Sequence, residues 1–273
     1  MLTSVKIEVR ECRPPDDCAV PELPSDVVNV WARSLDVPAS VEKACCELLS
    51  MEEHERAARY RVERPRKDFI VTRATLRSLA AAYLGTTPLQ LSFRYSKYGK
   101  PILDGAFDLR SLDLGFNDLR FNDLRFNVSH TEGLALIAFV RTHEIGIDVE
   151  RIRPQPDVRK LAERFFSLHE RHSLERLSGD ELQAAFFRCW TRKEAYVKAR
   201  GEGLSLPLQQ FDVSVAADES QALLATRPDP SEASRWILRD LPTGPGYEAA
   251  LAVAAVGDGK AGQGNTSSLV QVE

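Results

Sequence analysis

Apolar residues recur at helical spacing in two long segments of the chain. The first opens at Pro65 and ends at Gly85, and its buried face carries Phe69, Ile70, Leu76, Leu79, Ala80 and Tyr83. The second covers residues 180–200, ends at Gly201, and carries Leu182, Ala185, Phe186, Cys189, Trp190 and Val197. Apolar positions three and four residues apart share one side of a helix, so both segments are predicted to be amphipathic helices.

Three shorter helices are predicted by local signals. Ser40 begins one, residues 158–166 form another, and Ser50-Met-Glu-Glu53 forms a capping box for a charged helix over about 51–61. The remaining apolar runs favour strands over residues 4–9, 27–32, 89–95, 126–129, 133–140, 145–149, 211–215, 234–238 and 247–254. Each half thus has one long helix and several strands, which predicts an α+β fold of two units lying side by side.

A short tandem repeat interrupts the pattern. Residues 116–120 read FNDLR, residues 121–125 repeat them, and Phe126-Asn127 begins a third copy. Two and a half copies of five residues are too few for a repeat architecture, which needs several stacked units. We expect the duplication to lengthen a surface connection between residues 102 and 125.

Charge and composition exclude several classes of protein. The 273 residues hold 36 Lys and Arg against 40 Asp and Glu, a net charge of −4, so no overall basic field favours nucleic acid or anionic membrane. The longest apolar run, residues 249–256, is far shorter than the roughly 20 residues of a membrane span. The five cysteines lack CxxC spacing and the N-terminus lacks an apolar signal segment, which favours a cytoplasmic protein with reduced thiols.

Two carboxylates stand two residues apart at the end of the strand predicted over 145–149. Asp148 and Glu150 would point to the same face, and their like charges call for a cation between them. Oxygen ligands without His or Cys suit Mg²⁺. The same pattern also fits a strand that ends in two solvated acids.

A third carboxylate lies on the second long helix. Glu194 and Lys198 are four residues apart and therefore adjacent on its surface. They could be an ordinary exposed ion pair. The apolar flank from Phe186 to Trp190 would hold this turn against the core, so the pair could also complete a metal and phosphate site with Asp148 and Glu150.

Polar donors that could hold a phosphate gather elsewhere in the chain. Asn127, Ser129 and His130 lie at a strand end, where they could bind phosphate or ribose or simply cap the strand. No GxSxG or P-loop motif is present, so a hydrolase triad and a Walker-type nucleotide site are not expected. Basic residues available to a polyphosphate are Arg56, Arg59, Arg73, Lys97 and Lys100.

Taken in order, six motifs resemble the Sfp-type 4′-phosphopantetheinyl transferases, especially the bacterial and cyanobacterial members that serve secondary metabolism. They are Gly99-Lys-Pro101, Phe126-Asn-Val-Ser-His130, Ile145-Gly-Ile-Asp-Val-Glu150, Arg164-Phe-Phe-Ser-Leu-His-Glu170, Trp190-Thr-Arg-Lys-Glu-Ala-Tyr-Val-Lys198 and Gly203-Leu-Ser-Leu-Pro207. The resemblance runs from about residue 53 to 215 and more faintly to 254. It departs from the family at Glu53, where a basic residue is common, and in the lengthened 102–125 connection.

The resemblance implies a fold, a reaction and a set of site residues. The fold would be a pseudo-two-fold pair of α+β halves, residues 1–143 and 144–256, with a flexible tail over 257–273 and the active site between the halves. The reaction would move the phosphopantetheine arm of coenzyme A to a serine of an apo acyl, peptidyl or polyketide carrier protein, releasing adenosine 3′,5′-bisphosphate. A monomer would suffice, because the two halves together build the cleft.

The implied roles divide among three groups. Mg²⁺ would be held by Asp148, Glu150 and Glu194. Coenzyme A would contact Arg56, Lys97, Lys100, Asn127, Ser129, His130 and Lys198. Lys198 would neutralise the phosphate under attack, and the serine proton would pass to Glu194, to Glu170 or to a metal-bound water. The rival hypotheses are a catalytically inactive module of the same fold that binds coenzyme A or a carrier, and a Mg²⁺-dependent nucleotide hydrolase.

Overall fold

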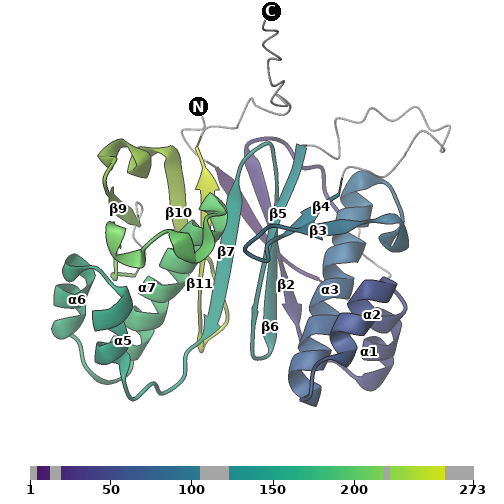
Figure 1. Cartoon of the computed structure of the whole chain (residues 1–273), viewed down its shortest axis with the longest axis horizontal. Helices are drawn as coiled ribbons and strands as arrows, with labels where there is room; N and C mark the ends of the chain where they lie inside the picture. The colour runs from purple at the N-terminus through teal and green to yellow at the C-terminus, as the bar shows by residue number, and fades with distance from the viewer. Residues whose placement is uncertain (1–4, 13–19, 105–122, 218–221, 256–273) are drawn as a thin grey trace, which may run out of the picture.

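Two groups of helices flank a central region of strands (Figure 1). The structure, a computed structural model, describes residues 5–12, 20–104, 123–217 and 222–255. The helices of the N-terminal half lie on one side of the strands, and those of the C-terminal half lie on the other. The predicted α+β fold of two similar halves is confirmed.

The N-terminal half is a mixed four-stranded sheet covered by three helices. The sheet has the order β1-β2-β6-β5, in which β1 and β2 run parallel and the other neighbours run antiparallel. Its strands are β1 (Lys6–Glu11), β2 (Val27–Ser34), β5 (Leu124–Thr131) and β6 (Leu134–Arg141). The helices are α1 (Ala39–Cys46), α2 (Met51–Ala58) and α3 (Glu63–Leu84). A small hairpin of β3 (Phe93–Tyr95) and β4 (Pro101–Leu103) follows α3 in the chain.

The C-terminal half pairs an antiparallel sheet of order β10-β11-β7 with one long and two short helices. Its strands are β7 (Ile145–Arg151), β8 (Phe211–Val213), β9 (Leu223–Thr226), β10 (Trp236–Asp240) and β11 (Tyr247–Ala254). Its helices are α5 (Val158–Phe165), α6 (Leu168–Glu175) and α7 (Gly179–Arg200). The apolar core of this half lies between α7 and the sheet and includes Tyr196, Phe211 and Leu238.

The two halves repeat the same helical arrangement. A short helix opens with a capping box in each half, Ser50 with Glu53 on α2 and Ser167 with Glu170 on α6. A long helix of 22 residues then follows and ends at a glycine with positive φ. In both halves the capping glutamate also forms an ion pair with a buried basic side chain of the long helix. Glu53 lies 2.6 Å from Arg77, and Glu170 lies 2.7 Å from Lys193.

Side chains, in place of a backbone ladder, join the two halves along β5 and β7. Three alternate residues of β5 each accept a hydrogen bond from a backbone N–H of β7. The bonds run from Ile147 to Asn127 Oδ1 (2.8 Å), from Val149 to Ser129 Oγ (3.4 Å) and from Arg151 to Thr131 Oγ1 (3.3 Å). We call this row of three bonds the polar seam. It satisfies backbone donors that would otherwise lie unpaired between the halves.

Some predicted elements differ from those observed. The strand expected over 89–95 is a 3₁₀ turn at Pro88–Gln90 followed by the short β3, because Thr87 and Gln90 form a capping box there. The helix α6 was not predicted. Among the described helices, none combines the length and apolar character needed to cross a bilayer. Most of the 102–125 connection, including the first FNDLR copy, and the proposed tail over 257–273 lie outside the described residues.

Candidate active site at the seam between the halves

The centre of the candidate site is a three-way contact between β5, β7 and α7. Lys198 Nζ lies 2.6 Å from Asp148 Oδ1 and 3.1 Å from Ser129 Oγ. The Ser129 hydroxyl donates to the same Asp148 oxygen at 2.8 Å. Lys198 is 50 positions from Asp148 and 69 positions from Ser129 in the chain, yet all three side chains meet at one oxygen of Asp148, beside the polar seam.

A glycine brings the helix close enough to the strand for this contact. A Cβ on Gly146 would lie 2.1 Å from the Ala195 carbonyl oxygen and 2.3 Å from the Ala199 nitrogen, both on α7. No side chain fits in that space, so only glycine lets β7 approach the backbone of α7 here. The side chains of Asp148 and Lys198 can then reach each other.

The carboxylates around this point carry negative charge that is not fully compensated. Asp148 Oδ2 is buried and has no hydrogen-bond partner. Burial and then the nearby Asp148 charge raise the pKa of Glu194, while Lys198 partly offsets the effect. Burial and then Asp148 also raise the pKa of Glu150, whose carboxylate accepts a long hydrogen bond from Thr131 (3.4 Å).

This donor set fits a divalent cation. An orphaned, buried carboxylate oxygen and two further carboxylates with raised pKa values make a region where positive charge would be favourable. All of these groups offer oxygen atoms, as Mg²⁺ prefers. Within the described ranges, no three His, Cys, Asp or Glu side chains already enclose a metal position.

Comparison with known proteins identifies the family. The model of the 4′-phosphopantetheinyl transferase superfamily matches residues 144–254, and that of the 4′-phosphopantetheinyl transferase N-terminal domain matches residues 38–141. A 4′-phosphopantetheinyl transferase of Nostoc sp., HetI, is 38% identical over 233 residues, which cover 85% of this chain and 90% of the relative. This chain belongs to the 4′-phosphopantetheinyl transferase family. The transferase Sfp of Bacillus subtilis is 27% identical over 229 residues, covering 83% of this chain and 92% of Sfp.

Two of the predicted coenzyme A contacts of this transferase have other partners. Asn127 is buried and its side-chain oxygen accepts from the Ile147 amide, so it belongs to the polar seam. The Lys100 ammonium points at backbone carbonyls of Ile145 and Lys198, at 3.0 and 3.1 Å. In this structure the hydrogen bonds of both side chains go to protein atoms, and their predicted contacts with coenzyme A stay a prediction.

Glu170 also has a different role from the one predicted. It is fully buried, and its Oε1 pairs with Lys193 at 2.7 Å and accepts from the Val213 amide at 2.8 Å. Its Oε2 accepts from the Ser167 amide as part of the capping box. With both oxygens occupied and no access to solvent, Glu170 cannot reach an incoming serine. The structure corrects its assignment from candidate base to structural residue.

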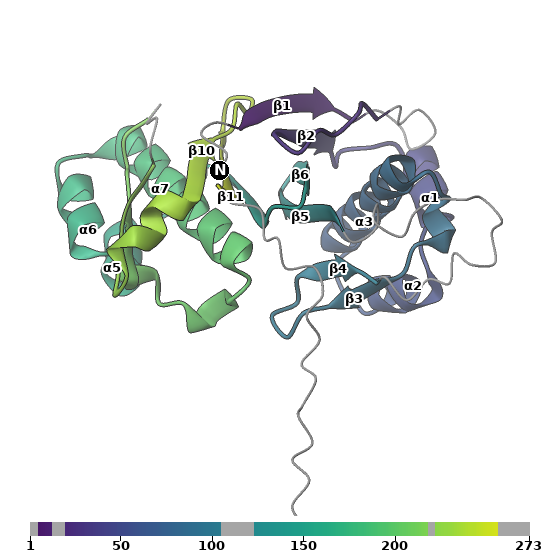
Figure 2. The ribbon, with the colours of Figure 1, turned by 90° about the horizontal axis from the view of Figure 1, so that it is seen from above.

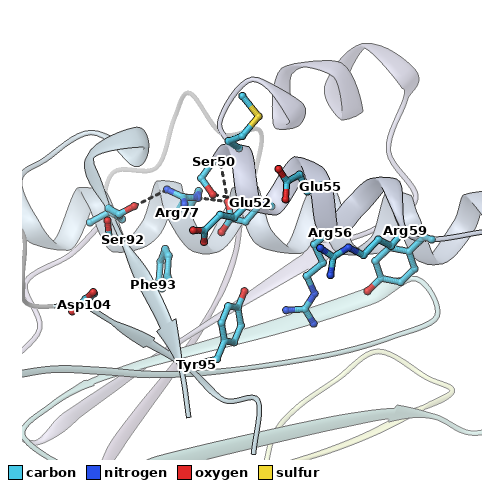
Figure 3. Close-up of a pocket in the computed structure, with 14 residues that line it drawn as sticks. Ser50, Glu52, Glu55, Arg56, Arg59, Arg77, Ser92, Phe93, Tyr95 and Asp104 are labelled. Atoms are coloured by element: carbon cyan, nitrogen blue, oxygen red, sulfur yellow. Dashed lines mark hydrogen bonds and ion pairs between the residues drawn. The ribbon is translucent and has the colours of Figure 1, made fainter. Parts of the chain in front are cut away.

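Arg56 and Lys97, two of the predicted basic contacts of the N-terminal half, have aromatic neighbours. Arg56 stacks over the rings of Phe69 and Tyr95, at 5.2 and 5.3 Å from their centres. It lines a groove of about 970 Å³ between α2 and the β3–β4 hairpin, together with Arg59 (Figure 3). Lys97 is exposed and lies over the Tyr98 ring.

His130 lies on β5 between two residues of the polar seam. It is exposed at the surface, yet partial desolvation lowers the pKa of its imidazole, with Asp68 opposing and Lys198 adding to the effect. A lowered pKa keeps the ring neutral near pH 7, so that it can donate a hydrogen bond without carrying a charge. Its interaction with Lys198 places it within electrostatic reach of the Asp148 centre.

One seam residue escaped the sequence analysis. Thr131 continues the alternation of Asn127 and Ser129 and contacts both Glu150 and the Arg151 amide. The sequence did contain a sign of the seam, because three side chains able to form hydrogen bonds occupy every second position of one strand. Their shared face was predictable from strand geometry. That they face a strand of the other half was not.

Proposed function

We propose that this transferase moves the phosphopantetheine arm of coenzyme A to a serine hydroxyl of an apo carrier protein at the Asp148–Lys198 centre. The serine oxygen forms a bond to the phosphorus that carries the pantetheine arm. The bond from that phosphorus to the bridging oxygen breaks, and adenosine 3′,5′-bisphosphate leaves with the electron pair. The serine proton passes to a base of the protein.

The observation that carries this proposal is the unpartnered Asp148 Oδ2 beside Lys198. A buried carboxylate oxygen without a partner costs free energy, unless the working protein supplies a cation there. We propose that Asp148, Glu150 and Glu194 hold Mg²⁺. When bound, Mg²⁺ would neutralise charge on the pyrophosphate and so assist departure of the bisphosphate.

The protein side chains of the centre have separate tasks in this proposal. Lys198, which is partly exposed, provides a fixed positive charge for the phosphate under attack. Glu194 accepts the serine proton, and its raised pKa suits a proton acceptor that works near neutral pH. Ser129 orients Asp148 through its 2.8 Å hydrogen bond.

The adenosine end of coenzyme A is assigned to fewer residues than the motifs implied. We propose His130 as a phosphate contact, since it is exposed and within electrostatic reach of Lys198. Arg56 is proposed as a second contact because its guanidinium lines the groove between α2 and the hairpin. We further propose that the enzyme acts as a monomer in the cytoplasm.

The test mixes the protein with coenzyme A, Mg²⁺ and a set of apo acyl, peptidyl and polyketide carriers, and follows carrier mass. We expect a gain of one phosphopantetheine arm on at least one carrier and its loss when a chelator removes the metal. Glu194→Gln should lower the rate by about 10²-fold or more, as removal of a group that acts in the transition state does. Glu181→Gln makes the same change at an exposed position of α7 and should transfer normally.

Other outcomes would favour the rivals. Binding of coenzyme A without mass gain on any carrier would favour an inactive module of the same fold. Release of adenosine 3′,5′-bisphosphate without a carrier would favour a hydrolase. Near-normal transfer by Glu194→Gln would remove Glu194 from the mechanism while leaving the activity itself established.

A further inference from the structure

The turn of the β3–β4 hairpin belongs to the N-terminal half but is fastened to the C-terminal half. In Figure 2 this turn points from its own sheet toward the opposite half. The Tyr98 hydroxyl lies 2.9 Å from Ser205 Oγ, in the 3₁₀ turn at Gly203–Ser205 that follows α7. A Cβ on Gly203 would lie 2.7 Å from the Tyr98 ring, so the glycine leaves room for that ring.

The ammonium group of Lys100 makes the second attachment. It donates to the carbonyl oxygens of Ile145 at 3.0 Å and Lys198 at 3.1 Å, and lies 3.7 Å from Glu144 Oε2. Burial lowers the pKa of Lys100, and the Glu144 carboxylate opposes that shift. Two of the three ammonium hydrogens bond these carbonyls, and the Glu144 carboxylate lies at ion-pair distance.

The two carbonyls mark the ends of the elements that carry the active-site side chains. Ile145 is the first residue of β7, which carries Asp148 three positions later. Lys198 lies in the last turn of α7, where helix carbonyls lack partners within the helix. A cation at this end is also favoured by the helix dipole. Lys100 thus caps α7 from the other half of the molecule.

The hairpin turn is closed by hydrogen bonds of its own. Ser96 accepts from the Lys100 amide through Oγ (3.1 Å), and its own amide donates to the Lys100 carbonyl (2.9 Å). Gly99 supplies the left-handed conformation that the turn needs, with φ of 81°. Lys100 therefore projects from a turn whose own hydrogen bonds hold it in place.

We infer that Lys100 is a positioning residue that holds β7 and the end of α7 in register, so that Lys198 meets Asp148. This inference rests on the proposed function for its catalytic consequence, but the contacts themselves do not. In this inference the ammonium acts on the site through the backbone of Lys198. Loss of the ammonium removes a hydrogen bond to the helical turn that carries Lys198. It leaves the side chains proposed to bind coenzyme A unchanged.

The test compares Lys100→Met, which keeps the stem without donors, with Lys100→Arg, which keeps charge and donors. In ligand-free protein, hydrogen exchange followed by mass spectrometry should speed up for Lys100→Met at residues 145–147 and 197–201. In transfer assays kcat should fall about tenfold or more, since small displacements of a catalytic group are costly. KM for coenzyme A and Kd for adenosine 3′,5′-bisphosphate should change less than about threefold, and Lys100→Arg should restore part of kcat.

Lys67→Met is the matched control. Lys67 also donates to a backbone carbonyl, that of Val37 at 2.6 Å, but both residues lie in the N-terminal half. This variant should leave exchange at 145–147 and 197–201 unchanged and should transfer at a normal rate.

Three results would overturn the inference or separate it from the proposed function. Unchanged exchange in Lys100→Met, together with a tenfold weaker Kd for the bisphosphate, would make Lys100 a phosphate ligand. Faster exchange with unchanged kcat would remove its catalytic consequence. If the wild-type protein loads no carrier, faster exchange in Lys100→Met would still support the contact between halves, and only the proposed function would fail.

Discussion

At the level of single residues, exposure and unfilled hydrogen bonds separate structural ion pairs from the candidate catalytic one. The Glu170–Lys193 pair is completely buried, and every oxygen of Glu170 has a partner. The Lys198 side chain is 28% exposed, and Asp148 keeps one oxygen without a partner. Both pairs are equally short, so distance alone would not distinguish them. A site that binds a ligand has polar atoms without hydrogen-bond partners in the protein, whereas the polar atoms of a structural ion pair have all their partners within it.

The raised pKa of Glu194 predicts that this residue destabilises the metal-free protein. The folded state binds its proton more tightly than the unfolded chain does, so the penalty is present above the raised pKa and disappears as pH falls through it. In chelator at pH 8, Glu194→Gln should therefore raise Tm by roughly 1–3 °C. The difference should shrink as the pH is lowered toward about 5.

Thermal unfolding of both proteins across this pH range provides the measurement, and Glu181→Gln is again the control. A Glu194→Gln variant that is less stable than the wild type at pH 8 would contradict the prediction. It would mean that the carboxylate is compensated by partners within the folded protein.

At the level of secondary structure, the close packing of α7 on β7 determines where the site can form. Gly146 permits the contact, and the residues that follow it on the strand include Asp148. The same helix carries Glu194 and Lys198 one turn apart, and Lys198 pairs with Asp148 on the strand. The N-terminal half uses an equally long helix, α3, whose buried Arg77 pairs with the capping glutamate Glu53.

Gly146→Ala should therefore separate α7 from β7. Its methyl group would overlap backbone atoms of Ala195 and Ala199, which cannot move as a flexible side chain would. We expect a loss of about 3 kcal/mol or more in the free energy of unfolding, measured with denaturant, because overpacking against backbone exceeds the usual core penalty. Gly244→Ala meets no atom within 4 Å and should change stability by less than about 1 kcal/mol. Equal effects of the two substitutions would refute the packing explanation.

At the level of the whole molecule, the polar seam and the hairpin turn join two α+β halves. The seam lies along β5 and β7, while Tyr98 and Lys100 connect the halves at the end of α7. The candidate site lies beside the seam and takes residues from both halves. This arrangement explains how one chain can assemble the site, since each half supplies groups the other lacks.

Asn127→Ala should weaken the junction between the halves. The Ile147 amide would lose its acceptor in a buried position, which costs about 1–3 kcal/mol. Denaturant unfolding should show this loss, and hydrogen exchange at residues 145–151 should become faster. Gln183→Ala removes a similar amide-to-backbone contact with Gln155, outside the seam, and should leave exchange at 145–151 unchanged. Unaltered exchange in Asn127→Ala would show that other contacts hold β7.

Much of the fold was predictable because its signals are local. Helical periodicity located α3 and α7 to within two residues, and the capping box of Ser50 located the start of α2. The capping box of Ser167 and Glu170 carried the same local signal for α6, but it was recognised only as part of a motif. The strand expected over 89–95 was confirmed only over Phe93–Tyr95, because the Thr87–Gln90 capping box places Leu89 in a 3₁₀ turn.

The sequence by itself determined that the chain is an α+β protein of two halves and which motifs it carries. Only the tertiary structure decided which contacts its polar motif residues make. Lys100, Asn127 and Glu170 bind groups of this protein, while Asp148 keeps an oxygen unfilled. The reason is physical: periodicity and capping depend on neighbours within a few residues. By contrast, the amide that Asn127 binds lies 20 positions away in the chain, and the Lys198 carbonyl that Lys100 binds lies 98 positions away.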